Sequence, residues 1–269
     1  MTTVRSGAAT ALSVSFLAMT SVLLPVDPAR EETELREYLG ERFELESLRN
    51  YQRTLDEEVE RVRDEQRLYR TSTAYLYNLT AFAMTGTKVP YLEELTAHVP
   101  PGARVLDYGC GIGSDGLLLA EAGYRVEFAD FDNPSVAYLR WRLHRRGIEA
   151  RVHDLERGVP GRFDAAFAFD VIEHVDDPFA FLGQMESLAH QVMVNFLEPE
   201  SGDQELHHDL PIRDLVDHAA KRRLRSYRVL HGRSHLVLYS PTVASPIRGL
   251  AQRAATRGVR LRHRLAARS

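Results

Sequence analysis

Residues 104–113 read Arg-Val-Leu-Asp-Tyr-Gly-Cys-Gly-Ile-Gly, a short apolar run that ends in Asp107 and passes directly into three glycines spaced two apart. The pattern predicts a β-strand followed by a tight loop. Gly109, Gly111 and Gly113 have no Cβ, so the backbone can take positive φ and approach a ligand closely. Residues 114–123 follow with a leucine-rich run that predicts a helix packed on the sheet. Strand, loop and helix together indicate a site for a nucleotide-like ligand.

The glycine spacing bears on which ligand this is. A dinucleotide fingerprint, G-x-G-x-x-G, can be placed on Gly111, Gly113 and Gly116, but counted from the first glycine of the loop its third position falls on Ser114. The better description is G-x-G-x-G, preceded two residues earlier by Asp107.

In that form the loop resembles the first motif of the class I S-adenosylmethionine (SAM)-dependent methyltransferases, which reads hydrophobic-hydrophobic-Asp-x-Gly-x-Gly-x-Gly and which residues 105–113 match without a gap. The resemblance covers residues 90–241. It implies an α/β fold with a Rossmann-like, seven-stranded, mostly parallel sheet in the order 3-2-1-4-5-7-6, helices on both faces and an antiparallel C-terminal hairpin. It also implies that Asp107 and the loop glycines hold the methionine portion of SAM.

A second predicted strand, residues 125–130, ends in Asp130. This acid lies about 20 residues beyond the glycine loop, where nucleotide-binding βαβ units carry the carboxylate that binds ribose. An ionised carboxylate accepts hydrogen bonds from both vicinal hydroxyls of a ribose. We therefore expect Asp130 to bind the ribose of the cofactor.

Residues 150–154 and 163–170 predict the third and fourth strands. The fourth run is almost wholly apolar, as a strand buried on both faces of a parallel sheet should be. The resemblance implies that Asp154 accepts a hydrogen bond from the exocyclic amine of adenine. Because ligands of open α/β sheets bind outside the carboxyl ends of the strands, we expect the four strand ends to form one pocket. The expected cofactor-binding residues are Asp107, Gly109, Gly111, Gly113, Asp130, Phe131, Asp154, Leu155 and Asp170.

Three histidines are candidate bases, because methyl transfer to a hydroxyl requires an aligned acceptor and a group that takes its proton. Histidine titrates near neutral pH. His174, just beyond the fourth strand, is the first candidate, and His207 and His208, in a polar loop before a predicted helix at residues 212–222, come next. A Glu-His pair at this place in related methyltransferases can also serve only to brace the loop.

Candidate acceptor contacts come from residues 69–82, which are rich in aromatics and hydroxyls. They precede a predicted helix at residues 91–98, where the resembled family often places a lid. Tyr75, Tyr77 and Asn78 are the candidates for substrate binding. The alternative is that they are packing aromatics with solvated hydroxyls.

A metal site is a further alternative. Residues 170–174, Asp-Val-Ile-Glu-His, resemble the Glu-x-x-Glu-His run of ubiquinone-type O-methyltransferases and small-RNA 2′-O-methyltransferases, where those side chains hold a divalent ion. Asp170 replaces the first Glu and shortens its reach. A mixed carboxylate and imidazole set could hold Mg²⁺, Mn²⁺ or Zn²⁺. We assign no residue to a metal and leave the divalent ion open.

Composition agrees with a cytoplasmic enzyme. The chain has 269 residues, 44% hydrophobic and 27% charged, enough for one domain with additions. A formal charge of −4 predicts no global attraction to nucleic acid or anionic lipid. The single cysteine, Cys110, excludes an intramolecular disulfide and is compatible with a reducing compartment.

The ends of the chain are less regular. We expect a disordered or optional leader over residues 1–28, with translation starting at Met19 as one option, a helical cap or lid over 29–89, the SAM-binding domain over 90–241 and a basic tail over 242–269. The segment from Pro241 to Ser269 has seven Arg and no acid. Such runs can lie on nucleic acid or on an anionic membrane, but an Arg- and Ala-rich terminus is more often a solvated or fraying helix, which is our expectation. Packing against the acidic N-terminal helix is also open.

The sequence thus predicts SAM-dependent methyl transfer to a small molecule, most readily to a hydroxyl oxygen. An RNA 2′-O-methyltransferase is the alternative within enzymes, although the acidic body and the lack of an added RNA-binding module count against it. A SAM-binding scaffold protein without catalysis is the alternative from another class. The oligomeric state is not predicted.

Overall fold

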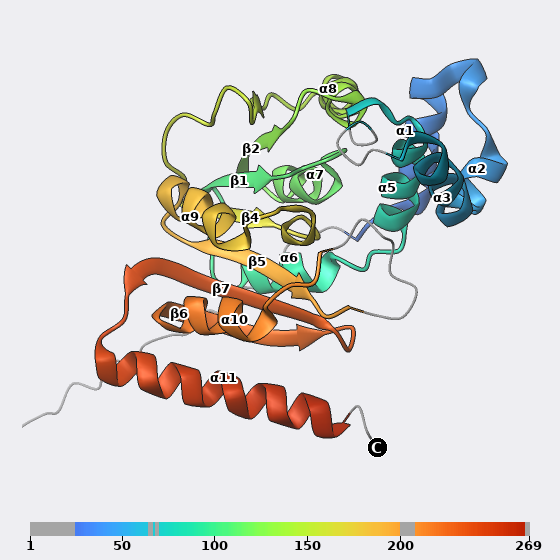
Figure 1. Ribbon diagram of the computed structural model, residues 1–269. Helices are drawn as coiled ribbons and strands as arrows, with labels where there is room; N and C mark the ends of the chain where they lie inside the picture. Colours follow the sequence, from blue (N-terminus) through green and yellow to red (C-terminus); the bar gives the residue numbers. More distant parts are fainter. Residues whose placement is uncertain (1–24, 64–66, 68–69, 200–207, 267–269) are drawn as a thin grey trace, which may run out of the picture.

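A seven-stranded sheet forms the centre of the computed structural model (Figure 1), which describes residues 25–63, 67, 70–199 and 208–266. The strand order is β3-β2-β1-β4-β5-β7-β6. Strands β1 to β5 run parallel, and β7 is antiparallel to both β5 and β6. The predicted sheet order and terminal hairpin are confirmed. The strands are β1 (Arg104–Tyr108), β2 (Arg125–Asp130), β3 (Val152–Asp154), β4 (Ala165–Ala168), β5 (Val192–Leu197), β6 (Arg222–Leu230) and β7 (Ser234–Val243).

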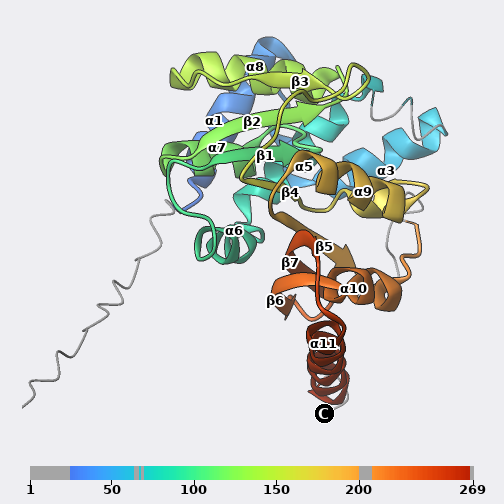
Figure 2. The ribbon, with the colours of Figure 1, turned by 90° about the vertical axis from the view of Figure 1, so that its left-hand side faces the viewer.

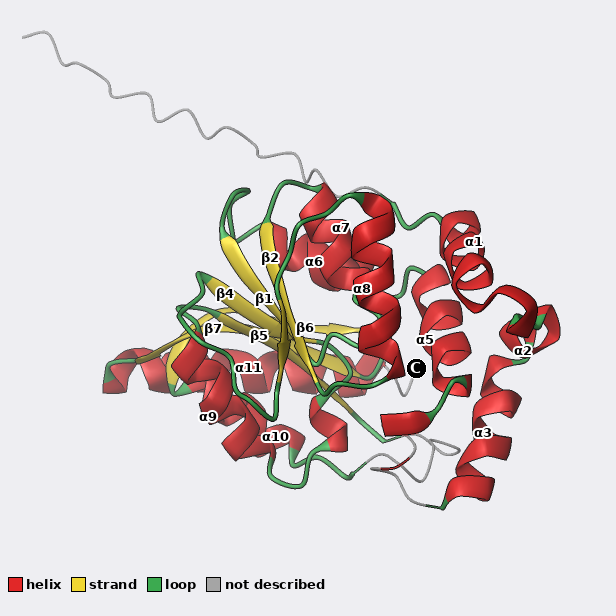
Figure 3. Cartoon of the chain, turned by 90° about the horizontal axis from the view of Figure 1, so that it is seen from above, coloured by secondary structure: helices red, strands yellow, loops and turns green. Residues whose placement is uncertain are grey.

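Helices cover both faces of the sheet, as Figure 3 shows from above. Successive side chains of a strand point to opposite faces, so Val105 packs with the helices of one layer and Leu106 with those of the other. The first layer holds α6 (Val89–Thr96), α7 (Ser114–Glu121) and α8 (Pro134–Arg146), and the second holds α9 (Pro178–Leu188) and α10 (Ile212–Ala220). A short 3-10 helix, η2 (Ile172–His174), follows β4.

The N-terminal cap is a group of short helices beside α8. Its elements are α1 (Pro28–Leu39), η1 (Gly40–Arg42), α2 (Leu45–Arg49), α3 (Tyr51–Val62) and α5 (Ala74–Met84). The predicted helical cap is therefore divided into several helices, and the first of them, α1, ends at Gly40, whose φ is +58°. Leu35 of α1 and Leu76 of α5 share an apolar cluster with Ile112 of the glycine loop and Tyr138 of α8. The cap and the sheet domain thus have part of their core in common.

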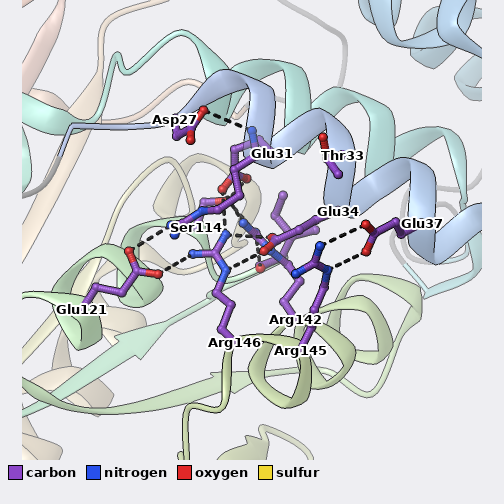
Figure 4. Close-up of polar contacts among 12 residues, drawn as sticks. Asp27, Glu31, Thr33, Glu34, Glu37, Ser114, Glu121, Arg142, Arg145 and Arg146 are labelled. Atoms are coloured by element: carbon purple, nitrogen blue, oxygen red, sulfur yellow. Dashed lines mark hydrogen bonds and ion pairs between the residues drawn. The ribbon is translucent and has the colours of Figure 1, made fainter.

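An ion-pair cluster joins α1 to α8 (Figure 4). Arg142 is fully buried, donates from Nε to Glu34 at 2.9 Å and pairs with Glu31. Arg146 donates from Nη2 to Glu34 at 2.7 Å and to Glu31 at 3.1 Å. Burial alone would raise the pKa of Glu34, but the hydrogen bonds and charges of the two arginines lower it. The buried acids Glu31 and Glu34 of α1 are therefore neutralised by α8.

The basic tail forms a long helix, α11 (Pro246–Ala266), that lies along β6 and α10 (Figure 2). Gln252 donates from Nε2 to the carbonyls of Ala220 and Arg222 at 2.9 and 2.6 Å, and Thr256 is buried. The tail is helical, as expected, but its described part is not fraying, because these polar contacts anchor its inward face while its outward face is exposed. Packing against the N-terminal helix is wrong, since α1 lies at the opposite end of the molecule (Figure 1).

The predicted leader falls outside the described residues up to residue 24. Asp27, inside the predicted leader, accepts hydrogen bonds from the backbone N–H groups of Ala29 and Arg30 and so caps α1. Within the part of the chain that the structure describes, no helix has the length and apolar character needed to cross a bilayer.

Candidate active site

A cavity of about 610 Å³ lies at the carboxyl edge of the sheet, between the strand ends and the cap. The ends of β1, β2 and β4 supply Asp107, Asp130 and Asp170 to its wall, and the glycine loop supplies Gly109 and Gly111. The cap closes the other side with residues from α1 and α5. The expected convergence of these strand ends on one pocket is thus present in the structure.

The glycine loop owes its shape to backbone conformations that a side chain would oppose. Gly109 has φ +76°, and a Cβ there would stand 2.7 Å from Cγ1 of Val171. Gly113 has φ +71° and is the N-cap of α7, where a Cβ would stand 2.4 Å from Cδ1 of Leu139. Gly113 therefore lies against Leu139 of α8 and, unlike Gly109 and Gly111, does not line the cavity.

Asp107 is fixed at the start of the loop. Its Oδ2 accepts from the backbone N–H of Gly116 at 3.1 Å, and the side chain is 5% exposed. Burial, together with the nearby charge of Asp115, raises the pKa of Asp107 well above its usual range. A buried carboxylate of this kind gains most from a cationic ligand group.

Asp130, at the end of β2, accepts one hydrogen bond from the glycine loop and one from Phe131, the residue that follows it in the chain. Its Oδ2 accepts from the N–H of Gly111 at 2.7 Å and its Oδ1 from the N–H of Phe131 at 2.7 Å. Burial raises the pKa of Asp130 to about 6, although these two backbone donors act to lower it. Each carboxylate oxygen still has a lone pair for a ligand hydroxyl, since an ionised carboxylate has about four acceptor sites.

Besides Asp130, three residues at the ends of β2 and β3 are expected to bind the cofactor, Phe131, Asp154 and Leu155, and two of them lie at the cavity. Phe131 and Leu155 line the cavity, but Asp154 does not. Asp154 instead accepts from the N–H of Glu156 at 3.0 Å and lies 3.3 Å from Nε of Arg157, so it stabilises the turn after β3. The expected contact of Asp154 with the ligand is therefore not supported by its position.

Lys88 is the principal site residue that the sequence did not reveal. Its Nζ donates to the carbonyl of Phe169 at 3.1 Å and lies 3.4 Å from Asp170 and 3.6 Å from Asp115. Burial alone would lower the pKa of Lys88, but the charges of Asp170, Asp115 and Asp107 outweigh it and raise the pKa, so the ammonium stays charged. Lys88 precedes α6 without a recognisable motif, and no local signal marked it.

Asn195, in the middle of β5, holds Asp170 in place. The Asp170 N–H donates to Oδ1 of Asn195 at 2.9 Å, and Nδ2 of Asn195 donates back to Oδ1 of Asp170 at 2.7 Å. Asp170 has φ +55°, a left-handed conformation that is uncommon for a residue with a side chain. The two-way pair with a fully buried Asn195 offsets that backbone cost.

The three candidate acceptor contacts lie on different faces of α5. Tyr75 lines the cavity together with Leu79 and Phe82, which follow at helical spacing. Tyr77 points elsewhere, because its hydroxyl donates to the carbonyl of Arg42 and accepts from the N–H of Glu44. Asn78 does not line the cavity either. Of the three candidates, the structure thus brings only Tyr75 to the cavity. Tyr77, two positions from Tyr75, lies about 160° away around the helix, and Asn78 lies beyond the edge of the lining face formed by Tyr75, Leu79 and Phe82. That periodicity was visible in the sequence and would have identified Leu79 and Phe82.

His174 and His208 both line the cavity, and they approach it from η2 and from the loop before α10. The N–H of His208 donates to the carbonyl of Glu173 at 2.8 Å, which ties this loop to η2. His207 lies outside the described residues. Two of the three candidate bases are thus brought to one side of the cavity.

A family model of a methyltransferase domain matches residues 75–243, more than half of the chain. The chain belongs to this methyltransferase family. A ubiquinone biosynthesis O-methyltransferase of Xanthomonas campestris pv. campestris (strain B100) is 36% identical over 103 residues, which make up 36% of this chain and 43% of that protein. The chain therefore spans less than half the length of this relative.

Two solved structures share the fold. A magnesium protoporphyrin IX methyltransferase from Synechocystis PCC 6803, with bound SAH, superposes with a TM-score of 0.52 and 17% identity over 65% of this chain and 91% of that one. An O-methyltransferase family protein from Burkholderia thailandensis gives a TM-score of 0.51 and 13% identity over 74% of this chain and 72% of that one. The prediction of a class I SAM-dependent methyltransferase is confirmed at the level of family and fold.

The charge of the methyltransferase cavity suits SAM, which carries a sulfonium and an ammonium against one carboxylate. The lining includes seven acids, namely Asp27, Glu31, Asp107, Asp115, Asp130, Asp170 and Asp176, against the three cations Arg30, Arg70 and Lys88. The net negative lining favours a cationic cofactor by direct Coulomb attraction in a partly desolvated space.

The residues expected as an alternative metal site are arranged differently. Asp170 faces the Lys88 ammonium, which already supplies a positive charge 3.4 Å away. Glu173 is 2% exposed and does not line the cavity. Among the residues that the structure describes, no group of three or more His, Cys, Asp or Glu side chains is disposed to hold a metal ion. The described side chains of this run do not fit a metal centre.

Proposed function

We propose that this protein transfers the methyl group of SAM to a hydroxyl oxygen of a small molecule. The observation that supports it most is the single cavity in which the glycine loop, Asp107, Asp130 and Asp170 meet. Relatives named as ubiquinone biosynthesis O-methyltransferases favour a hydroxyl acceptor, with the limited coverage given above.

The cofactor would bind across the strand ends. Asp107 and the backbone of Gly109 would face the methionine portion, and the Lys88 ammonium is placed to neutralise its carboxylate. Asp130 would accept from the two ribose hydroxyls, and Phe131 would contact the adenine. Bound SAM would supply an activated methyl group on its sulfonium.

The acceptor would occupy the part of the cavity between α5 and η2. Tyr75, Leu79 and Phe82 form a largely apolar wall there, and Phe181 of α9 extends it. This wall favours an acceptor with an apolar or aromatic body, since such side chains gain little from a strongly polar one. His174 would accept the hydroxyl proton as the oxygen attacks the methyl carbon in line with the departing sulfur.

Cofactor binding and turnover can be tested separately. Calorimetry with SAM and with S-adenosylhomocysteine should show binding of both, and Asp130→Ala should weaken it at least tenfold, about the worth of one charge-assisted hydrogen bond. Failure of Asp130→Ala to weaken SAM binding would contradict the assignment of the site.

Transfer itself can be followed with methyl-labelled SAM and a panel of phenols and catechols. We expect label in an O-methyl product, and we expect His174→Gln to lower kcat by about 100-fold with little change in SAM affinity, as the loss of a general base does. His208→Gln is the matched comparison on the same side of the cavity. SAM binding without transfer to any acceptor, small molecule or RNA, would instead support the scaffold alternative.

A further inference from the structure

The outward face of α11 is apolar. Ile247, Leu250, Leu261 and Leu265 are 85%, 65%, 60% and 60% exposed. At 100° per residue these four side chains fall within one stripe about 60° wide, which Ala251 and Ala254 extend to about 100°. Figure 2 shows the helix at the edge of the molecule, beneath β6 and α10, and the exposure of the four side chains places their face on the outside.

The inward face of the same helix is polar. Gln252 donates to two backbone carbonyls, Thr256 is 1% exposed, and Arg260 lies 3.5 Å from Asp217 of α10. An ordinary surface helix buries its apolar stripe against the core and leaves its polar face to water. In α11 the arrangement is reversed, so its apolar stripe contributes nothing to the fold that the structure describes.

Positive charge is concentrated in this part of the chain. Residues 221–269 contain thirteen of the 34 Lys and Arg residues and none of the 38 Asp and Glu residues, which leaves 21 cations against 38 acids in residues 1–220. On α11, exposed Arg248 and Arg262 flank the stripe on one side and exposed Arg257 flanks it on the other. An apolar stripe bordered by arginines is the pattern of a helix that lies in the plane of a membrane interface.

We propose that α11 binds the surface of a membrane that contains anionic lipid. The leucines and Ile247 enter the acyl boundary, and the arginines contact the headgroups. The helix lies on the bilayer and does not cross it, because no described helix is apolar enough to span. The proposal is independent of the methyl transfer proposed above.

Two other occupants fit the charges less well. A second copy of the chain, paired stripe to stripe, would bring arginines of both copies together in a segment that has no acid to balance them. A nucleic acid would engage the arginines but would leave the leucines and Ile247 unburied. Of these three occupants, only an anionic bilayer satisfies both the apolar and the charged parts of the face.

Co-sedimentation of the full chain with lipid vesicles tests this proposal. We expect binding to vesicles of phosphatidylcholine and phosphatidylglycerol in equal parts, little binding to phosphatidylcholine alone, and a fall in binding as salt is raised. Leu250→Gln/Leu261→Gln should lower the partition coefficient by about tenfold or more. Arg248→Gln/Arg257→Gln/Arg262→Gln should lower it by about fivefold for each arginine removed.

Matched controls test whether the loss of vesicle binding is specific to α11 or follows from removing any exposed apolar side chain or any positive charge. Phe179→Gln removes an exposed apolar side chain from α9, and Arg49→Gln/Arg53→Gln/Arg151→Gln removes the same charge from other exposed positions. Both controls should bind vesicles nearly as wild type. All altered side chains of α11 are exposed, so the variants should keep the wild-type melting temperature.

Four results would overturn the proposal. The first is no sedimentation with the anionic vesicles, and the second is equal loss of binding in the α11 variants and their controls. The third is a dimer, formed without lipid, that Leu250→Gln/Leu261→Gln dissociates, which would assign the face to a second copy. Binding of an oligonucleotide that this variant retains, in the absence of vesicle binding, would assign the arginines to nucleic acid.

Discussion

Asp130 links the chemistry of a single residue to a measurable pH dependence. Burial raises the pKa of Asp130 to about 6. The ionised carboxylate can accept hydrogen bonds from both ribose hydroxyls, whereas the protonated form carries an O–H donor on one oxygen. As pH falls through 6 the group becomes protonated, so the dissociation constant for SAM should rise about tenfold between pH 7 and pH 5. Calorimetry across that range measures it.

The control for this prediction is a neighbouring acid in the same loop. Asp132→Asn removes an exposed carboxylate that pairs with Arg140 at 2.7 Å and does not line the cavity. It should leave the pH profile unchanged, whereas Asp130→Asn should bind SAM weakly with a flatter profile. A wild-type affinity independent of pH in this range would show that Asp130 is not the ribose ligand.

Single residues also mark where sequence reasoning succeeded and where it could not. Asp107 and Asp130 were identifiable because each ends a strand at a fixed spacing from the glycines, and strand ends of a parallel sheet share an edge. Lys88 was not, because its place beside Asp170 depends on how α6 packs against β4. Asp154 matched its motif position, yet a turn N–H and Arg157 engage its carboxylate, a local competition that spacing does not reveal.

At the scale of elements, the contact between α1 and α8 predicts unequal effects of two arginines three positions apart. Arg142 is fully buried and donates to Glu34, to Ser114 and to the carbonyl of Ile112. Among the described residues, Arg142→Gln leaves Arg146 as the one remaining cation for the buried Glu31 and Glu34, so the free energy of unfolding should fall by about 3 kcal/mol. Urea denaturation followed by circular dichroism measures the loss.

Arg145→Gln is the matched comparison on the same helix (Figure 4). Arg145 pairs with Glu37 at 2.6 Å, but both side chains are well exposed, and exposed pairs contribute less than about 1 kcal/mol. Since Arg142 also holds residues of the glycine loop, its loss should weaken SAM binding, and that of Arg145 should not. Equal effects of the two substitutions would contradict this account of the cluster.

Element prediction was reliable for the strands of the parallel sheet and unreliable where helices meet other helices. The apolar run of β4 and the acid-terminated β2 marked their strands directly. The faces of α5 and α11 could not be assigned from composition alone, because aromatic or arginine content does not say which side a neighbour covers. The structure resolves this by packing α5 through Leu76 and α11 through Gln252.

For the whole molecule, net charge is a poor guide because the charges are segregated. A total of −4 predicted no attraction to anionic surfaces, but it averages a strongly acidic body with a C-terminal segment that has no acid. Glu31 and Glu34 near the N-terminus are paired with α8, and other acids line the cofactor cavity. Local fields act within about 10 Å at moderate salt, so the distribution and not the sum decides what each end attracts.

The shared core of cap and sheet predicts that the whole molecule unfolds in one transition, which SAM shifts upward. The only tryptophan, Trp141 of α8, lies 5.7 Å from the ring of Tyr38 of α1, so its fluorescence reports the cap contact. Circular dichroism reports the molecule as a whole. Because Leu35 and Leu76 pack with Tyr138, the two melting curves should coincide.

Saturation with SAM sharpens this prediction, because the cavity is lined by both parts. At a free concentration 100 times its dissociation constant, SAM should add about 2.7 kcal/mol, which moves the melting temperature of both signals by roughly 5–10 °C. Asp130→Asn, at the same SAM concentration, should shift much less. A ligand stabilises only the part of the structure on which its binding depends. If the Trp141 fluorescence transition came before the circular dichroism transition and did not shift with SAM, the cap would open independently and would not enclose the cofactor.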